Sequence, residues 1–322
     1  MFDVVALGEC LIDFTPNGIN EQGMQTFSQN PGSAPANVLA MYAKLGGHVA
    51  FIGKVGNDAF GRFLEKNMKQ AGIDVSALVF EKKAPTTLAF VQLDEDGDRS
   101  FSFYRDPGAD LLLQTDEVDM KKLMHCKIFH FGSVSLTGET SRSATLHAAK
   151  TAKKAGAIVS YDPNYRPFLW DCEQHAREEM LAALPLADLV KVSYEEMEFI
   201  TGKSALQEGA AALAAYGAAL VVVTMGAKGA YYHAASCCGQ LPAYNVATID
   251  TTGAGDAFWG ALLWKVHQYG SEKMGTLGED EWKDIVSFAN AAGSLTTTGR
   301  GAIPAMPTKE EIEGCRKEGM GF

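Results

Sequence analysis

The segment Asp250-Thr-Thr-Gly-Ala-Gly-Asp256 places two glycines and a carboxylate directly before an apolar run of helical length, residues 257–266. Gly253 and Gly255 let backbone amides approach an anion because they carry no β-carbon. At the positive N-terminus of the following helix, those amides favour a phosphoryl group. Asp256 beside them could accept a hydroxyl proton, and together these groups make a phosphotransferase centre. A simple helix cap is the alternative, but a cap requires one polar residue and no flanking pair of glycines.

Other polar residues suit the recognition of a sugar. The side chains of Asp13 and Asn37 can form directional hydrogen bonds with hydroxyl groups. Taken alone, Asp13 could equally be a turn or cap residue, and Asp162-Pro-Asn-Tyr-Arg166 could be a polar turn after a strand. Ser193-Tyr-Glu-Glu196 could be an acidic first helical turn. These residues are therefore informative only in combination.

The elements that must position these residues alternate along the chain. Continuous apolar runs, typical of strands covered on both faces, lie at residues 4–7, 49–52, 127–131, 157–161, 189–192 and 220–224. Helices are predicted between them, at 34–45, from Asp58 to Gly72, and at about 139–154, and each stops at a glycine. This alternation predicts an α/β fold of three layers, α/β/α, with a mainly parallel central sheet.

One region departs from this pattern. Residues 86–93 and 99–105 flank an acidic turn, Asp94-Glu-Asp-Gly-Asp98, whose Asp-Gly pair is typical of a β-hairpin. In the second arm one face would carry two aromatic residues and a cation, Phe101, Phe103 and Arg105. Such a face suits a flap that closes over a polar ligand, and an ordinary edge hairpin is the alternative. We interpret the chain, residues 1–322, as one domain with an inserted lid formed by about 14–31 and 85–108.

Composition excludes several classes of protein. The net charge of −11 argues against general affinity for nucleic-acid phosphates. No apolar stretch reaches the roughly 18 residues needed to span a bilayer, and the N-terminus lacks the pattern of a secretory signal. The six cysteines are scattered without zinc-ligand spacing. We therefore expect a cytoplasmic protein whose partner is a small molecule.

The Asp250–Asp256 segment with its following helix resembles the C-terminal signature of the ribokinase-like (PfkB) carbohydrate kinases. The segments Gly8-Glu-Cys-Leu-Ile-Asp13 and Asn30-Pro-Gly-Ser-Ala-Pro-Ala-Asn37 are similar to the family's first strand and N-terminal signature. The resemblance covers most of the chain. Two positions depart from the pattern, because Ser33 replaces the second of two adjacent glycines and Ser193 replaces an asparagine.

The resemblance implies a role for each matching position. It implies a catalytic base and anion-binding turn at Asp256, Gly253, Ala254 and Gly255. It implies sugar contacts from residues spread over the chain, namely Asp13, Gly32, Asn37, Phe103, Arg105, Asn164, Arg166 and Asp256. It implies nucleotide contacts from Lys191, Ser193, Glu196, Thr224, Gly226, Gly229 and Asn290.

The same resemblance implies cofactors and assembly. ATP would be the phosphoryl donor with Mg²⁺ at its phosphates, organised by Glu196. Family members often bind a monovalent cation beside the catalytic turn, so K⁺ is a further candidate cofactor, with Asp250 and Thr252 at the matching positions. Members of the family often form a homodimer through the lid. Such a dimer is expected here on that ground.

The substrate is predicted from the lid. Phe103-Tyr-Arg-Asp-Pro-Gly-Ala-Asp110 is similar to the flap of the fructokinase branch. Acid-sugar kinases often place a tyrosine where this chain has Phe103, which offers no hydrogen bond to a carboxylate. We therefore predict transfer of the ATP γ-phosphoryl group to fructose, giving fructose 6-phosphate. 2-Keto-3-deoxygluconate is the second candidate substrate, and a non-catalytic sugar-binding or regulatory relative is the alternative of another class.

Overall fold

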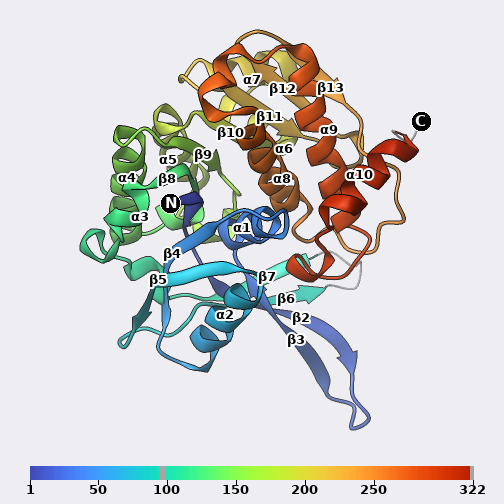
Figure 1. The fold of residues 1–322 in the computed structure, drawn as a ribbon. Coiled ribbons are helices and arrows are strands. Elements are labelled where there is room, and N and C mark those ends of the chain that lie inside the picture. The colour runs from blue at the N-terminus through green and yellow to red at the C-terminus, as the bar shows by residue number, and fades with distance from the viewer. Residues whose placement is uncertain (94–98, 320–322) are drawn as a thin grey trace.

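The chain folds into a large and a small β-sheet, shown in Figure 1. The structure, a computed structural model, describes residues 1–93 and 99–319, with the backbone alone at 91–93, 99–101 and 271–273. In these ranges the large sheet runs in the order β13 (Cys238–Leu241), β12 (Ala230–Ala234), β11 (Leu220–Thr224), β10 (Leu189–Ser193), β9 (Ile158–Asp162), β8 (Cys126–Gly132), β1 (Phe2–Leu7), β4 (Val49–Gly56) and β5 (Ile73–Glu81). Neighbours from β11 to β5 are parallel, whereas β12 and β13 are antiparallel.

The strands of the large sheet are buried on both faces, as their continuous apolar runs predict. Every residue of β4 is buried. In β1, Val4 and Ala6 enter one hydrophobic core, whereas Val5 and Leu7 enter the other. This alternation follows from the period of two of a strand, which sends successive side chains to opposite faces. All six predicted strands are present, and their ends differ from the predicted ranges by four residues at most.

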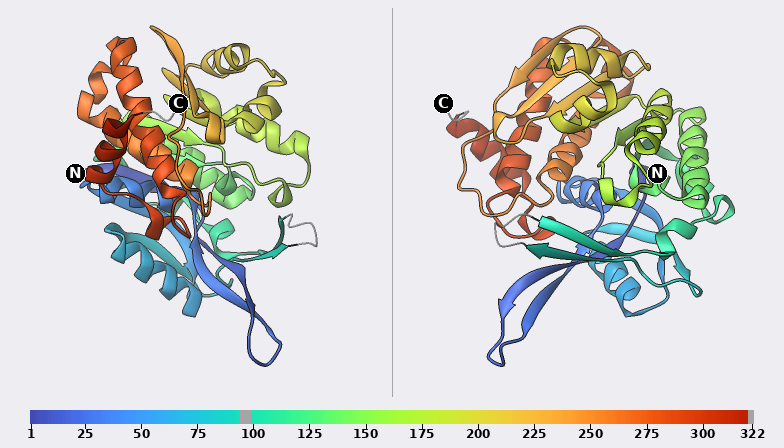
Figure 2. Two further views of the ribbon diagram at one scale, coloured as in Figure 1. Left: turned by 90° about the vertical axis from the view of Figure 1, so that its right-hand side faces the viewer. Right: turned by 180° about the vertical axis from the view of Figure 1, so that it is seen from behind.

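Helices cover both faces of the large sheet and complete the predicted three layers (Figures 1 and 2). One core contains residues of α1 (Ala34–Lys44), α2 (Ala59–Gln70), α8 (Ala254–Tyr269), α9 (Glu279–Thr296) and α10 (Lys309–Glu318). The opposite core contains residues of α3 (Met120–Met124), α4 (Glu139–Lys154), α5 (Glu173–Ala183), α6 (Tyr194–Thr201) and α7 (Leu206–Ala214). Among the described helices, none combines the length and apolar character needed to cross a bilayer.

Side-chain caps set where the first helices begin. The Asp58 carboxylate accepts a hydrogen bond from Gly61 N at 2.8 Å, so α2 starts where the sequence predicted. Ser33 Oγ accepts from Ala36 N at 3.1 Å and begins α1. Ser33, which departs from the family pattern, is therefore the N-cap of the helix that carries Asn37.

The small sheet lies beside the large one and has the order β3 (Gln25–Gly32), β2 (Leu11–Ile19), β6 (Leu88–Leu93) and β7 (Arg99–Tyr104). The predicted hairpin corresponds to β6 and β7, which pair antiparallel, while its acidic tip at 94–98 lies outside the described residues. Figure 2 shows β2 and β3 projecting from the body of the molecule. Only residues 8–10 separate β1 from β2, so the small sheet starts at the carboxyl edge of the large sheet.

Candidate active site

The N-terminus of α8 provides a turn with exposed backbone amides. Gly253 is the N-cap residue, with φ of 74° in the left-handed region that favours glycine. A β-carbon at Gly253 would also lie 2.3 Å from Ala302 Cβ, so the turn has no room for a larger residue. The helix begins at Ala254, three residues before the predicted apolar run, and therefore contains Gly255 and Asp256 in its first turn. The first amides of a helix favour an anion.

Asp256 is buried in this first turn, with 8% of the residue exposed. Its Oδ2 accepts a hydrogen bond from Asn37 Nδ2 at 2.8 Å, which joins α8 to α1. Burial raises the pKa of Asp256 to about 6, and the positive charge of Lys191 opposes the rise. A carboxylate with such a pKa is ionised at neutral pH and is basic enough to accept a hydroxyl proton.

Lys191 and Asp162 form a buried ion pair next to this turn. Lys191 Nζ lies 2.6 Å from Asp162 Oδ2. A β-carbon built on Gly255 would be 3.5 Å from Lys191 Nζ, which places the ammonium group beside the first turn of α8. Burial lowers the pKa of Lys191, but the carboxyl groups of Asp162, Glu196 and Asp256 together outweigh it, so the pKa is raised and the side chain is a cation. Asp162 Oδ1 is buried and has no hydrogen-bond partner among the described residues.

Asp13 and Gly32 meet where β2 and β3 pair. A β-carbon at Gly32 would lie 2.3 Å from Asp13 Oδ2, so the carboxylate rests against the glycine backbone. Burial raises the pKa of Asp13 to about 6, and the positive charge of Arg166 lowers it in part. Arg166 acts in the same direction on Asp256. The exposed guanidinium of Arg166 is thus electrostatically coupled to both carboxyl groups.

The turn after β9 presents Asn164 and Arg166. Asn164 has φ of 49°, the sole left-handed conformation among the described residues other than glycine. Asparagine tolerates this conformation better than most residues. Arg166 Nη1 donates to Tyr165 O at 3.1 Å, and its side chain is otherwise exposed.

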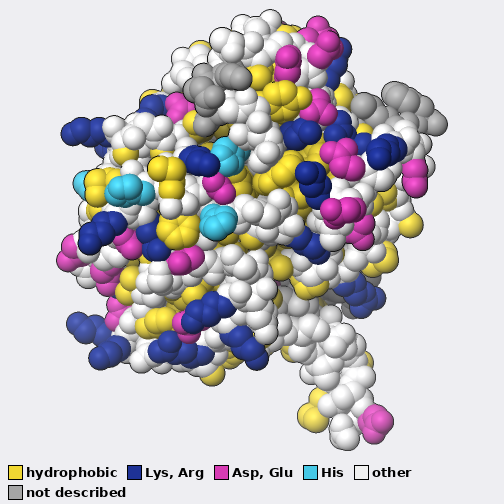
Figure 3. Space-filling model, viewed as in Figure 1, with side chains coloured by type: hydrophobic (Ala, Val, Ile, Leu, Met, Phe, Trp, Pro, Cys, Tyr) yellow, Lys and Arg dark blue, Asp and Glu magenta, His cyan; other side chains and the backbone are white. Residues whose placement is uncertain are grey.

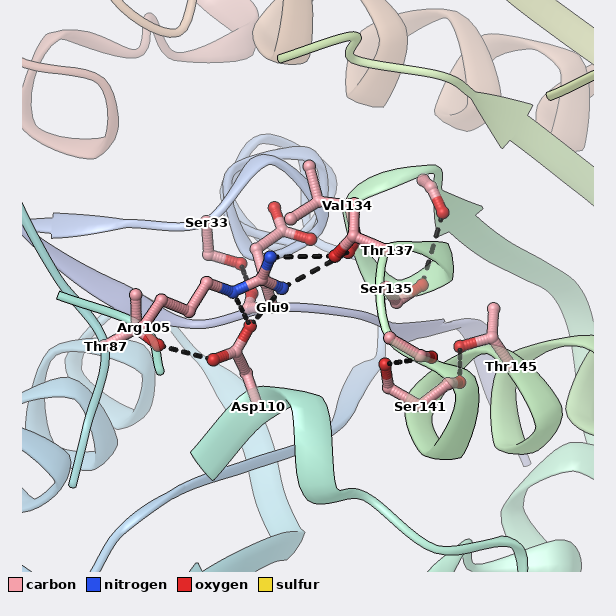
Figure 4. Close-up of polar contacts among 12 residues, drawn as sticks. Glu9, Ser33, Thr87, Arg105, Asp110, Val134, Ser135, Thr137, Ser141 and Thr145 are labelled. Atoms are coloured by element: carbon pink, nitrogen blue, oxygen red, sulfur yellow. Dashed lines mark hydrogen bonds and ion pairs between the residues drawn. The ribbon is translucent and has the colours of Figure 1, made fainter. Parts of the chain in front are cut away.

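Strand β7 brings Phe103 and Arg105 to the same region. Phe103 pairs with Ala89, which in turn pairs with Asp13 across the small sheet. Arg105 follows the strand and forms an ion pair with Asp110. Figure 4 shows its guanidinium between Asp110 and Thr137, with Glu9 beside it. The Phe101 side chain, predicted on the same face, is not among those described.

Glu196 serves local structure through both of its carboxylate oxygens. Oε2 accepts from Ser193 N at 2.7 Å, and Oε1 accepts from Tyr165 N at 2.7 Å. Ser193 Oγ in return accepts from Glu196 N, so the two residues form a capping box at the start of α6. Burial and the nearby Asp162 charge raise the pKa of Glu196. Carboxylate oxygens retain further lone pairs for a ligand.

The predicted nucleotide residues near the sheet edge come from the end of β11, the turn that follows it and α9. A β-carbon at Gly229 would lie 2.0 Å from Leu241 O, and Met225 N donates to Gly229 O, which closes a tight turn over Gly226. Asn290 is buried in α9 and donates from Nδ2 to Leu241 O and Pro242 O. Thr224 ends β11, and its Oγ1 donates to Val192 O at 3.3 Å. Gly229 and Asn290 thus both lie against Leu241 O.

Asp250 organises the turn before α8. Its Oδ1 accepts from both N and Oγ1 of Thr252, and its Oδ2 accepts from Gly301 N. The two residues predicted for a monovalent cation are therefore in contact, whereas Glu196 is on a separate element. In the described part of the chain, no cluster of three or more His, Cys, Asp or Glu side chains could hold a metal ion by itself.

The sequence-based prediction missed Asp162 and Glu9 as members of this site. Glu9 directly follows β1, and its Oε2 is buried without a hydrogen-bond partner in the described residues. Asp162 ends β9. One signal could have found both, because a polar residue at the carboxyl end of a parallel strand lies at the edge where α/β sheets bind ligands.

The site combines a helix N-terminus with a buried carboxylate, and it lies at the carboxyl edge of a mainly parallel sheet. This arrangement is typical of a phosphotransferase active site. The chain matches the model of the pfkB family carbohydrate kinases over residues 1–309 and belongs to that family. It is 44% identical over 312 residues to fructokinase-1 of Zea mays, covering 96% of each chain.

Solved structures agree with this assignment. The fructokinase of Xylella fastidiosa with bound ATP superposes with a TM-score of 0.91 at 34% identity and covers 99% of both chains. A double mutant of the Vibrio cholerae fructokinase in the form bound to fructose, ADP and potassium ion superposes with a TM-score of 0.84 at 36% identity. That match covers 97% of this chain and 98% of the other.

Proposed function

We propose that this carbohydrate kinase transfers the γ-phosphoryl group of ATP to fructose and forms fructose 6-phosphate. The observation that carries the proposal is the buried Asp256 carboxyl in the first turn of α8, hydrogen-bonded to Asn37 and beside the Lys191 cation. The choice of fructose is supported by relatives named fructokinase that match nearly the whole chain.

Asp256 accepts the proton of the attacking hydroxyl, whose oxygen then bonds to the γ-phosphorus as the bond to the ADP oxygen breaks. The amides of Ala254, Gly255 and Asp256 stabilise the negative charge on the phosphoryl oxygens. Gly253 permits the turn that exposes these amides, since its φ is positive. Lys191 adds a positive charge beside Gly255. Because phosphoryl transfer requires little covalent chemistry from the protein, positioning and electrostatics account for most of the rate.

The sugar lies between the small sheet and α8. Asp13 and Asn37 accept and donate hydrogen bonds to its hydroxyls, and Gly32 gives its backbone room to approach. Arg166 and Asn164 reach the sugar and the incoming phosphate from the turn after β9. Phe103 covers the sugar with an apolar surface, and Arg105 completes the pocket wall from the end of β7.

ATP lies on the turn between β11 and β12 and against α9. Thr224, Gly226, Gly229 and Asn290 line the nucleotide, while Ser193 and Lys191 face its phosphates. Mg²⁺ supplies charge neutralisation at the phosphates, and it needs only one or two protein carboxylates there. Glu196 and the buried Asp162 Oδ1, which has no partner among the described residues, would supply such carboxylate ligands. K⁺ would bind beside the turn that Asp250 and Thr252 hold together.

The small sheet acts as a lid on a single kinase domain, residues 1–322. Closing it over the sugar excludes water, which otherwise competes with the hydroxyl as phosphoryl acceptor. The opposite face of the small sheet carries contacting aromatic side chains, among which Phe27 and Tyr104 are exposed. A second copy of the chain would cover that face and form a homodimer through the lid.

The free thiols support a cytoplasmic location. All six cysteines are free, and free thiols suit the reducing cytoplasm. We place the enzyme there, and fractionation of cells that express the tagged chain tests this location.

The test of the function is ATP consumption that depends on the sugar. A coupled ADP assay on purified protein would use fructose, ribose, 2-keto-3-deoxygluconate and fructose 6-phosphate as acceptors. We expect fructose to give the highest kcat/KM. A clear preference for 2-keto-3-deoxygluconate contradicts the substrate, and ATP consumption that no sugar increases contradicts the kinase activity itself.

A further inference from the structure

Almost all N–H groups of the Arg105 guanidinium already donate hydrogen bonds within the protein. Its Nε and Nη2 both donate to Asp110 Oδ2, at 2.9 and 2.6 Å. Nη1 donates to Thr137 Oγ1 at 2.8 Å, and Nη2 also donates to Val134 O at 3.3 Å. These contacts occupy four of the five N–H groups of a guanidinium. Arg105 therefore offers a ligand at most one unoccupied N–H group.

The acceptors around Arg105 are themselves held in place (Figure 4). Thr137 Oγ1 donates to Val134 O at 2.7 Å, so it faces Arg105 as an acceptor. Thr87 Oγ1 donates to Asp110 Oδ1 at 2.5 Å, which fixes the second carboxylate oxygen. The Arg105 and Asp110 side chains are only 6% and 2% exposed. This ion pair is therefore built into the fold and is not a transient surface contact.

The pair is part of the sugar site. Ile12 N, beside Asp13, donates to Thr87 O at 3.0 Å, and Thr87 Oγ1 donates to Asp110, so Asp110 is held close to the strand that carries Asp13. The buried Cys10 thiol is electrostatically coupled to Glu9, Asp110 and Asp13. Asp13 in turn rests against Gly32. Asp110 thus acts on Arg105 within the same pocket wall that faces the sugar.

Charge at this wall does not favour an anion. Glu9 lies close enough to Arg105 and Asp110 for its carboxyl to respond to both charges. When Glu9 is neutral, the net charge of Glu9, Arg105 and Asp110 is zero. When Glu9 is ionised, their net charge is −1. The other cations of the site are balanced as well, because Lys191 pairs with Asp162, and Arg166 is coupled to Asp13 and Asp256.

We propose that Asp110 is a specificity-determining residue, which neutralises Arg105 so that the site binds neutral sugars and rejects sugars that carry a carboxylate. An incoming carboxylate would have to displace Asp110 to bind the guanidinium with two hydrogen bonds, and it would find no net positive charge there. The inference rests on the proposed function, whose sugar site it refines by naming the class of substrate and the residue that selects it.

The test is the ratio of kcat/KM for fructose to that for 2-keto-3-deoxygluconate. Asp110→Asn keeps a side chain of the same shape and an acceptor for Arg105 but removes the negative charge. We expect this variant to lower the ratio at least about tenfold, the usual effect of one charge-assisted hydrogen bond, through a lower KM for the acid sugar. Asp116→Asn, which changes an exposed carboxylate outside the cluster, should leave the ratio unchanged.

A double variant shows whether Arg105 is responsible. Arg105→Gln combined with Asp110→Asn removes both charges and should not bring the ratio below the wild-type value. The proposal is overturned if Asp110→Asn phosphorylates fructose with an unchanged ratio. It is equally overturned if the double variant lowers the ratio of kcat/KM values as strongly as the single variant does.

A second measurement uses the wild-type protein and does not depend on the folding of a variant. Calorimetric titration should show that fructose binds at least tenfold more tightly than 2-keto-3-deoxygluconate. Equal or tighter binding of the acid sugar contradicts the role of Asp110. A wild-type protein that binds fructose preferentially but phosphorylates no sugar contradicts the proposed function and leaves the selection by charge standing.

Discussion

Burial is the largest influence on the carboxyl groups at the active site. It raises the pKa of Asp256 to about 6 and that of Asp13 to about 6, and Lys191 and Arg166 offset the rise only in part. Asp256 could be predicted from the sequence because its glycine-flanked turn is local. The ion pair of Lys191 with Asp162 could not, because the two residues are on different strands and meet only through the parallel pairing of β9 and β10. The sequence-based prediction also marked Arg105 as a sugar contact without including its ion pair with Asp110.

The pKa of Asp256 predicts an acid limb in the activity. Below about pH 6 the carboxyl becomes protonated and can no longer accept the hydroxyl proton. We expect kcat/KM for fructose to fall about tenfold for each pH unit below this value. Steady-state rates between pH 5 and pH 8 test it, and a profile that stays flat down to pH 5 contradicts Asp256 as the base.

Protonation of the site carboxyl groups does not itself favour unfolding over this range. The pKa values of Glu9, Asp13 and Asp256 are raised in the folded protein, so the folded state binds these protons more tightly than the unfolded chain. Acidification from pH 7 to pH 5 therefore favours the folded state at these three groups. Thermal unfolding recorded across the same pH range is the control.

At the scale of elements, the contact between α1 and α8 positions the site. It brings Asn37 of α1 to Asp256 of α8, and Gly260 makes the close approach possible. The strands and helices named from the sequence were predictable because their apolar runs and capping residues are local signals. The parallel pairing of β2 with β6 joins residues far apart in the sequence, so no local pattern indicates it. The start of α8 was predicted three residues late, since its first turn contains glycines, which are weak indicators of a helix.

Replacing Gly260 tests this contact. A β-carbon there would lie 2.5 Å from Val38 O and 2.8 Å from Met41 Cβ, so Gly260→Ala must push α1 away from α8. We expect a loss of about 1–3 kcal/mol in the free energy of unfolding, together with a lower kcat/KM, because Asn37 moves with α1.

A helical glycine with open space around it provides the matched control. At Gly314 in α10, an added β-carbon meets nothing within 4 Å. Gly314→Ala should raise stability by about 0.5–1 kcal/mol and leave kcat/KM unchanged. Urea denaturation measures the free energy of unfolding, and the coupled assay measures kcat/KM. Equal changes in the two variants would contradict the role of Gly260 in the close approach of α1 and α8.

At the scale of the whole molecule, the projecting small sheet accounts for much of the shape. On the face shown in Figure 3, its projecting part carries hydrophobic side chains near the tip, where Ile19 and Met24 are exposed. Phe90 packs against Phe14, Phe27 and Tyr104 on one face of the same sheet. The sequence indicated aromatic residues in the hairpin, but the sharing of this face with β2 and β3 depends on the tertiary fold.

The exposed aromatic face predicts the state of association. Tyr104 is 65% exposed there, so Tyr104→Glu would place a charge in the proposed dimer interface. We expect sedimentation at micromolar concentration to show a dimer for the wild type and a monomer for this variant. Tyr216→Glu, which alters an exposed tyrosine after α7, should remain dimeric. A wild type that sediments only as a monomer contradicts the dimer.

The chemistry at the α8 N-terminus is tested most directly by Asp256→Asn. The substitution keeps a similar shape beside Asn37 but cannot accept a proton. We predict that kcat with fructose and ATP falls by roughly 10²–10⁴-fold, the usual contribution of a general base, while calorimetry shows fructose binding changed only slightly. A variant that turns over at nearly the wild-type rate would contradict the assignment of Asp256 as the base.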